Sequence, residues 1–319
     1  MYYNSKFLKI IKIISNNKKK NNNLSKNDAY FLLWSILNNN ISDIELGTIL
    51  VAMRIKGETI NEIIGFLKVI KNSFKKIKFF KYKKYAPIVI PSYNGTKKNI
   101  NFIPLLALLL ARENIPVLIH GTINNFNKIT TTKILQKLGF RNAHNYKDIN
   151  FLLKTKKIAF FSIKKLFPKI YRLLSLRFFL GIRNFANFLI KIIQPFSKPS
   201  LRLISYSHIK YFNILSKIFI NLNFKKEGGV FLMKSTEGEV MTNIKKMKQI
   251  NWFFLNKNEI IYNKINKKIF NIFLKRKNNI KNTAFLTKEI LIGKIPIPFF
   301  IKKQIKICIY MSKMINLYN

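Results

Sequence analysis

Residues 91–139 constrain the fold more than any other stretch, because they repeat one order of elements twice. The apolar run at 86–90 predicts a buried strand just before them, and the apolar run at 102–111 predicts the helix that follows. A second strand is predicted at 115–119, and a second helix at about 130–138 ends before a glycine. The stretch is therefore expected to form two successive strand–loop–helix units of a parallel α/β sheet.

Two polar turns follow the predicted strands, one at 91–101 and one at 120–130. In a parallel sheet the carboxyl ends of neighbouring strands meet at one edge, and ligands of open α/β sheets bind there. These two turns are therefore where the sequence predicts a ligand site.

Three helices are predicted near the N-terminus, at about 27–38, 43–54 and 60–73. Each begins with the capping-box spacing, in which a hydroxyl residue precedes an acid by three positions. The pairs are Ser25 with Asp28, Ser42 with Glu45, and Thr59 with Glu62. Residues 54–59 (RIKGET) join the last two helices, and a helix end, a glycine and a new N-cap explain them without any chemistry.

The rest of the chain continues the alternation. Strands are predicted at 158–162, 201–206 and 229–234. Helices are predicted at 165–180, from after residue 184 to about 193, at 210–221, from about 284 to about 292, and at 299–313. Residues 75–84 (KKIKFFKYKK) alternate basic and aromatic side chains. They predict either a nucleic-acid patch with stacking rings or an exposed hinge between two parts of the chain.

The formal net charge of +47, from 59 Lys and Arg against 12 Asp and Glu, indicates a polyanionic partner such as nucleic acid or an anionic membrane. The excess has a second explanation, because Lys, Asn, Ile, Phe and Tyr are all abundant, as a strongly AT-biased genome would produce. Both interpretations stay open. The small number of acids also leaves few candidates for acid–base catalysis.

The only cysteine, Cys308, excludes an intrachain disulfide and a cysteine metal cluster, which fits a reducing cytoplasm. The longest apolar run, 102–111, is too short to cross a bilayer. No small-residue cleavage site follows the apolar residues 7–14. We therefore expect a soluble, cytoplasmic protein with no membrane partner.

Several segments, in this order and spacing, resemble the anthranilate phosphoribosyltransferase family, which has the family 3 glycosyltransferase fold. The segments are RIKGET at 54–59, PSYNG at 91–95, His120-Gly121, GIRN at 181–184 and STEGE at 235–239. The resemblance covers roughly residues 20–315. PSYNG and TEGE resemble the divergent, DNA-binding YbiB-type branch more closely than the enzymes of the family.

The resemblance implies an α/β protein with two parts. A small, discontinuous, all-helical domain at 1–80 is joined in space by about 165–195, and a larger α/β domain at 81–164 and 196–319 holds a mostly parallel central sheet. In the family the helical part forms the dimer interface, so the resemblance also implies a homodimer.

The enzymes of the family bind phosphoribosyl pyrophosphate and magnesium, and several groups that they use are replaced here. Their glycine-rich loop, whose N–H groups form an anion nest, corresponds to residues 91–95, where only Gly95 is a glycine. A serine–threonine pair of the enzymes corresponds to Ile103 and Pro104. We therefore expect the nest to be missing and phosphoribosyl pyrophosphate not to bind tightly.

Polar and basic residues that remain near the predicted strand ends, together with one arginine of the GIRN segment, are the candidates for phosphate or nucleic-acid binding. They are Ser92, Asn94, Gly95, Lys97, Lys98, Asn101, His120, Gly121, Lys128 and Arg183. Each also has a structural explanation, such as a turn, a helix cap or a solvated lysine. Glu237 and Glu239 correspond to the acidic pair that holds magnesium in the enzymes, so they are the metal candidates, with capping or ion pairing as the alternative.

Two functions follow from these observations. The first is a non-catalytic, sequence-independent nucleic-acid-binding protein, which requires no cofactor and has no catalytic residues. The alternative, implied by the resemblance, is a phosphoribosyltransferase like that of tryptophan biosynthesis, with an altered substrate and magnesium. The sequence does not separate DNA from RNA.

Overall fold

The computed structural model describes residues 5–16, 22–78, 84–125, 127–220, 224–241, 250–254, 257–261 and 278–318. The chain separates into two compact units. Unit 1 is Met1–Lys75 with Phe167–Ile193, and unit 2 is Lys76–Leu166 with Gln194–Asn319.

Unit 1 is all-helical. Its helices are α1 (Ser5–Ser15), α2 (Lys26–Leu37), α3 (Asp43–Lys56), α4 (Ile60–Asn72), α9 (Pro168–Ser175), α10 (Arg177–Leu180) and α11 (Ala186–Leu189). The predicted caps start α2, α3 and α4: Ser25 accepts the N–H of Asp28, and Ser42 and Thr59 form complete capping boxes. These side chains satisfy N–H groups that the first turn of a helix leaves without partners.

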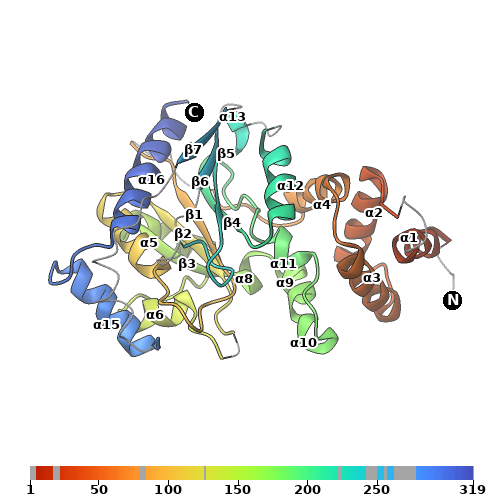
Figure 1. The fold of residues 1–319 in the computed structure, drawn as a ribbon, viewed down its shortest axis with the longest axis horizontal. Coiled ribbons are helices and arrows are strands. Elements are labelled where there is room, and N and C mark those ends of the chain that lie inside the picture. Colours follow the sequence, from red (N-terminus) through yellow and green to blue (C-terminus); the bar gives the residue numbers. More distant parts are fainter. Residues whose placement is uncertain are drawn as a thin grey trace. The chain divides into compact units, whose positions relative to one another are not determined.

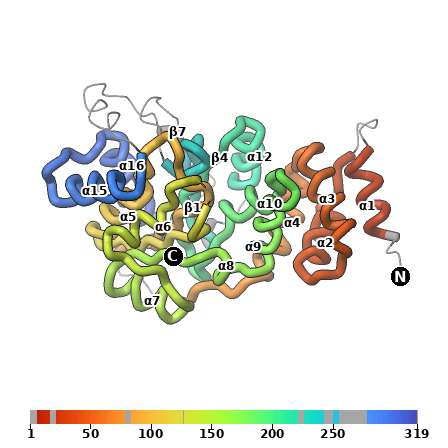
Figure 2. The backbone as a smooth tube through the Cα atoms, turned by 90° about the horizontal axis from the view of Figure 1, so that it is seen from below, coloured from red at the N-terminus to blue at the C-terminus, as the bar shows by residue number. Residues whose placement is uncertain are grey.

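The segment that begins at Phe167 packs beside α4 although it lies far later in the chain (Figure 2). Phe66 of α4 stacks on Phe185 with ring centroids 4.8 Å apart, and Phe74 stacks on Phe167 at 5.0 Å. Buried aromatic pairs contribute about 0.5–1.5 kcal/mol beyond the area that they bury. The helical unit is thus built from two separated stretches of chain.

Lys56, within residues 54–59, forms a buried polar junction between α3 and α4 with Glu62, whereas Arg54 and Ile55 of the same segment are exposed. Gly57 ends α3 with a φ of 74°, which glycine adopts at little cost. The Glu62 carboxylate accepts the N–H groups of Leu24 and Thr59 and the ammonium of Lys56, each at 2.8 Å. Only 3% of the Lys56 side chain and none of the Glu62 side chain is exposed. This pairing gives the RIKGET segment a structural role.

Unit 2 is built on a seven-stranded sheet with the order β3-β2-β1-β4-β5-β6-β7. The strands are β1 (Ile88–Ser92), β2 (Val117–Gly121), β3 (Ile158–Ser162), β4 (Ser200–Tyr206), β5 (Gly228–Lys234), β6 (Ile250–Phe254) and β7 (Lys257–Ile261). Strands β1 to β5 pair in parallel, and β6 and β7 add an antiparallel edge. The predicted fold class, a small helical domain with a larger, mostly parallel α/β domain, is confirmed.

Helices cover both faces of this sheet (Figure 1). They are α5 (Ile103–Arg112), α6 (Thr131–Lys137), α7 (Tyr146–Thr155), α8 (Ile163–Leu166), α12 (Ile209–Ile220), α13 (Phe224–Glu227), α15 (Ile280–Leu291) and α16 (Phe299–Leu317). Helices α5 and α16 lie on one face and α12 on the other. Because both faces are covered, all residues of β1, β2 and β3 are buried.

The structure differs from the sequence prediction in three respects. Residues 165–180 do not form one helix: α8 ends at Leu166, and Pro168 starts α9 because proline fits the first turn of a helix but not its interior. The helix expected to reach residue 193 ends at Leu189. Helices α7 and α13 and the antiparallel strands β6 and β7 were not predicted. None of the described helices has both the length and the apolar character needed to cross a bilayer.

Candidate functional site

The turns that follow β1 and β2 lie side by side at the carboxyl edge of the sheet. Thr96 N–H donates to Ile129 O at 3.0 Å, and Ile129 N–H donates back to Thr96 O at 2.9 Å. Gly121 permits the close approach of the strands, because a Cβ there would lie 1.7 Å from the carbonyl oxygen of Ser92. The two turns in which the sequence predicted a site are therefore in contact.

Two of the candidate residues use their polar groups inside this contact. The Ser92 hydroxyl is 2.8 Å from the hydroxyl of Thr131. The Asn101 side chain donates to the same hydroxyl at 3.1 Å, and its oxygen accepts the N–H of Ile103 at the start of α5 at 3.1 Å. Ser92 and Asn101 are both buried. Thr131, which was not singled out in the sequence, connects them.

His120 is fully buried and forms a hydrogen bond with the hydroxyl of Tyr93. Burial lowers the pKa of His120 to about 3. Burial, and then the charge of Glu239, raise the pKa of Tyr93 well above its usual value. Both side chains are therefore neutral at neutral pH, and Nε2 of His120 has no hydrogen-bond partner among the described residues. This pair carries no charge at neutral pH.

The backbone after β1 is bound by an acidic turn that follows β5. The N–H groups of Asn94 and Gly95 both donate to Oε1 of Glu239, at 2.7 and 2.5 Å. The Asn94 side chain donates to the carbonyl oxygen of Gly238 at 3.0 Å. Glu239 is completely buried, so its carboxylate is enclosed between the two loops.

Glu237 binds the next part of the same loop. Its Oε2 accepts the N–H of Lys97 at 2.6 Å, and its Oε1 accepts the N–H groups of Lys98 at 3.0 Å and Asn99 at 2.7 Å. The side-chain amide of Asn99 adds a further bond of 2.7 Å. Burial raises the pKa of the Glu237 carboxyl, but these hydrogen bonds together lower it below its usual range. Glu237 is therefore charged at neutral pH.

This arrangement corrects the expectation that the loop has lost its anion nest. Five backbone N–H groups, those of Asn94, Gly95, Lys97, Lys98 and Asn99, point at carboxylate oxygens, and we call them the anion cradle. Of these residues only Gly95 has a positive φ, 64°. The loop bends around two separate carboxylates, so its N–H groups point at anionic oxygens. It needs no further glycine at positive φ to do so, although the sequence predicted that more glycines would be required.

Magnesium, which the family resemblance implied for Glu237 and Glu239, does not fit these residues. Their carboxylates accept hydrogen bonds from N–H groups, which are not metal ligands. Within the described part of the chain, no three His, Cys, Asp or Glu side chains are grouped so that they could hold a metal ion.

The remaining candidates are basic and more accessible. Lys97 and Lys98 are exposed at the tip of the cradle, and Lys128 is partly exposed in the turn before α6. Arg183 is exposed too, but it belongs to unit 1. Residues 79–83, the centre of the basic and aromatic segment, lie outside the described residues.

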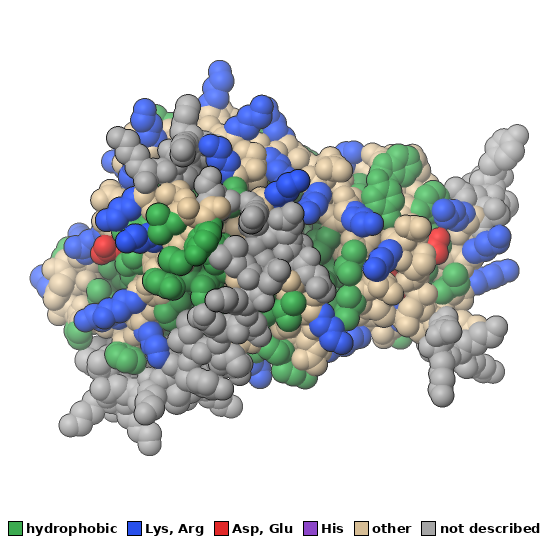
Figure 3. Space-filling view, turned by 90° about the horizontal axis from the view of Figure 1, so that it is seen from above, with side chains coloured by type: hydrophobic (Ala, Val, Ile, Leu, Met, Phe, Trp, Pro, Cys, Tyr) green, Lys and Arg blue, Asp and Glu red, His purple; other side chains and the backbone are tan. Residues whose placement is uncertain are grey.

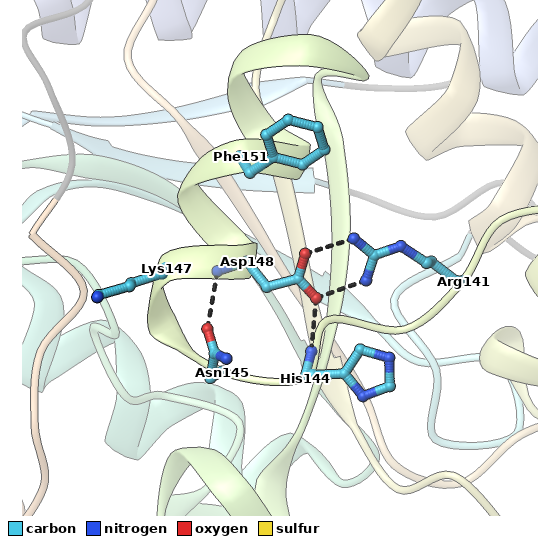
Figure 4. Close-up of a pocket in the computed structure, with 6 residues that line it drawn as sticks. All are labelled: Arg141, His144, Asn145, Lys147, Asp148 and Phe151. Carbon is cyan, nitrogen blue, oxygen red and sulfur yellow. Dashed lines mark hydrogen bonds and ion pairs between the residues drawn. The ribbon is translucent and has the colours of Figure 1, made fainter.

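A separate hollow of about 530 Å³ lies at the start of α7 (Figure 4). Its lining residues are Arg141, His144, Asn145, Lys147, Asp148 and Phe151. Two hydrogen bonds of 2.6 Å join Arg141 to Asp148, and the N–H of His144 adds one of 2.8 Å. These bonds, led by that from Arg141, hold the pKa of Asp148 below its usual range. The acid of this hollow is thus engaged in structural bonds.

Comparison with known proteins gives similarities over most of the chain. The glycosyl transferase family, helical bundle domain, matches residues 10–74. The uncharacterized protein YbiB of Escherichia coli (strain K12) is 33% identical over 304 residues, which cover 95% of this chain and 93% of YbiB. The anthranilate phosphoribosyltransferase of Buchnera aphidicola (subsp. Acyrthosiphon pisum, strain Tuc7) is 28% identical over 64% of this chain and 58% of its own length.

Among solved structures, the anthranilate phosphoribosyltransferase of Thermus thermophilus superposes with a TM-score of 0.70. The alignment covers 98% of this chain and 90% of the other, at 15% sequence identity. At that identity the similarity shows the fold alone.

Proposed function

Because this chain belongs to the anthranilate phosphoribosyltransferase-like family, we propose that it is a non-catalytic member that binds nucleic acid through phosphate contacts, without reading base sequence. The observation that carries the proposal is the filled anion cradle: Glu237 and Glu239 take the N–H groups that a pyrophosphate would need. The single cysteine of the chain, Cys308, fits a reducing cytoplasm as its location.

Other features of the site argue against a transferase. Ile103 and Pro104, which stand where the enzymes of the family have hydroxyls, are buried in the first turn of α5. The buried His120 is neutral, so it offers no cationic group to a phosphate. Polyphosphate binding depends on charge-assisted hydrogen bonds and free N–H donors, and this site supplies neither at its centre.

The charge of the chain supports the nucleic-acid part of the proposal. Lys and Arg side chains are spread over the face seen in Figure 3, and acidic side chains are few there. The carboxylates bound by the cradle, those of Glu237 and Glu239, accept backbone N–H groups. The side-chain ammonium groups of Lys97 and Lys98 make no ion pair with these two carboxylates. Phosphate contacts of this kind give affinity without base readout.

Two titrations of the full chain test the proposal. Labelled DNA or RNA strands of equal length and unrelated sequence should bind with affinities within about threefold of one another, because phosphates are the same in every sequence. Phosphoribosyl pyrophosphate with magnesium should give no calorimetric signal at physiological concentration. Micromolar affinity for phosphoribosyl pyrophosphate, with turnover of an aromatic or nucleobase acceptor, would support the transferase alternative instead.

We also propose a homodimer formed through unit 1. Its helices expose large apolar side chains, namely Tyr30 and Trp34 on α2 and Ile44 and Ile55 on α3, of which Ile44 is 84% exposed. Sedimentation at micromolar concentration should show a dimer, and the double variant Ile44→Asp, Ile55→Asp should shift it to monomer, because burying two carboxylates is costly. A wild-type monomer at that concentration would contradict the proposal.

A further inference from the structure

We propose that the anion cradle is a working anion site whose occupant is part of the chain. Glu237 and Glu239 act as an internal ligand in the place of a pyrophosphate-class anion. The proposal assigns these two residues a role that is neither metal binding nor catalysis. It does not depend on nucleic-acid binding, so the two can fail separately.

The donors of the cradle are those that a phosphate would use. Carboxylate and phosphate oxygens both accept backbone N–H groups, and charge-assisted bonds of this type are short. The bonds from Gly95 and Lys97, at 2.5 and 2.6 Å, are shorter than the usual range of about 2.7–3.2 Å for N–H donors. Glu239 accepts two of the five N–H groups and Glu237 accepts the other three, so each end of the cradle holds one anionic group.

The acidic turn is shaped to deliver these carboxylates. Glu237 and Gly238 have positive φ angles of 52° and 85°, and Thr236 and Glu239 close the turn with mutual backbone hydrogen bonds. A Cβ on Gly238 would lie 2.1 Å from the Asn94 side-chain nitrogen, so the turn fits tightly against the loop that it binds. A left-handed, non-glycine residue such as Glu237 persists only where its surroundings favour it.

The loop is held from its other side as well. The Asn125 side chain donates to the carbonyl oxygen of Asn94, and the Asn278 side chain donates to those of Lys97 at 3.1 Å and Asn99 at 2.8 Å. With its carbonyl oxygens fixed outward, the loop keeps its N–H groups directed at the acidic turn. A donor set that is preorganised from both sides should retain its shape when the carboxylates are removed.

The test is the double variant Glu237→Ala, Glu239→Ala of the full chain, titrated with inorganic pyrophosphate by calorimetry. The matched control is Glu113→Ala, Glu289→Ala, which removes the same charge from the C-cap of α5 and from helix α15. We expect the cradle variant to bind pyrophosphate at least about tenfold more tightly than the control or the wild type. The free energy of two charge-assisted hydrogen bonds corresponds to more than this factor in affinity. Equal affinities in all three proteins would overturn the proposal.

Hydrogen exchange gives a second measurement that is specific to the loop. The five amides of the cradle should exchange faster in the cradle variant, and pyrophosphate should restore their protection there but leave the control unchanged. Should the double variant fail to fold, Glu237→Ala alone opens the more accessible half of the cradle. The same tenfold gain is expected from it, and its absence would equally contradict the internal ligand.

Discussion

The affinity of this protein for nucleic acid is expected to fall on the order of a thousandfold when salt rises from 50 to 200 mM. Each phosphate that Lys or Arg neutralises releases condensed counterions, so log K falls with log salt by about 0.9 per contact on duplex and about 0.7 on single strands. A surface that makes roughly 5 to 8 contacts produces a loss of this size. Fluorescence anisotropy of a labelled duplex over that salt range measures it.

The slope also tests whether particular basic residues make the phosphate contacts. Changing Lys97, Lys98 and Arg183 together to Gln should flatten the slope by about 2 to 3 and weaken binding to all sequences alike, because three phosphate contacts are lost. The matched control changes three exposed lysines on helices, Lys68, Lys137 and Lys154, with one in unit 1 and two in unit 2 as in the test variant. It should flatten the slope by less than about 1.

Equal effects from the two triple variants would mean that binding is spread over the whole basic surface. The charge excess would then be explained by genome composition, and the claim of a site at Lys97 and Lys98 would be lost while nucleic-acid binding itself remained. A slope near zero for the wild type would remove the nucleic-acid proposal altogether.

The elements that position the site could be predicted because their signals are local. The first strand was expected at 86–90 and is Ile88–Ser92, a shift of two residues. Apolar runs and turn residues mark such elements, but the hydrogen bonds that end a strand come from its neighbours. Helix α7 carried a signal that was overlooked: Asn145 accepts the N–H of Asp148, the same N-cap spacing that marked the three predicted helices.

The anion cradle could not be predicted, because its donors and acceptors are distant in the chain. Asn94 and Glu239 are separated by 145 positions, and no local pattern links a backbone N–H group to a particular carboxylate. Counting glycines in the loop gave the wrong answer, since the loop bends around its acceptors with Gly95 alone at positive φ. The antiparallel strands β6 and β7 were missed for a related reason: β6 is held by pairing with β5 and β7 by pairing with β6, and these contacts are tertiary.

The buried junction of unit 1 leads to the largest expected loss of stability. Replacing Glu62 with Ala leaves the buried ammonium of Lys56 uncompensated and removes the acceptor of two backbone N–H groups. Breaking a buried ion pair at one partner costs about 3–5 kcal/mol. Since about 1.4 kcal/mol is a factor of ten, amide protection in α2, α3 and α4 should fall about a hundredfold or more, measured by hydrogen exchange of the full chain.

Glu45 provides the matched control, because it fills the same position of the capping box that starts α3 but is accessible to solvent. Glu45→Ala should cost about 1 kcal/mol or less, the usual value of an exposed cap. The double variant Lys56→Met, Glu62→Gln removes both charges and keeps an acceptor for one of the two N–H groups, which bond to different oxygens of Glu62, so it should recover part of the lost protection. If Glu62→Ala and Glu45→Ala lowered protection equally, the capping contact alone would explain the contribution of Glu62 to the stability of unit 1. The buried ion pair would then contribute nothing to that stability.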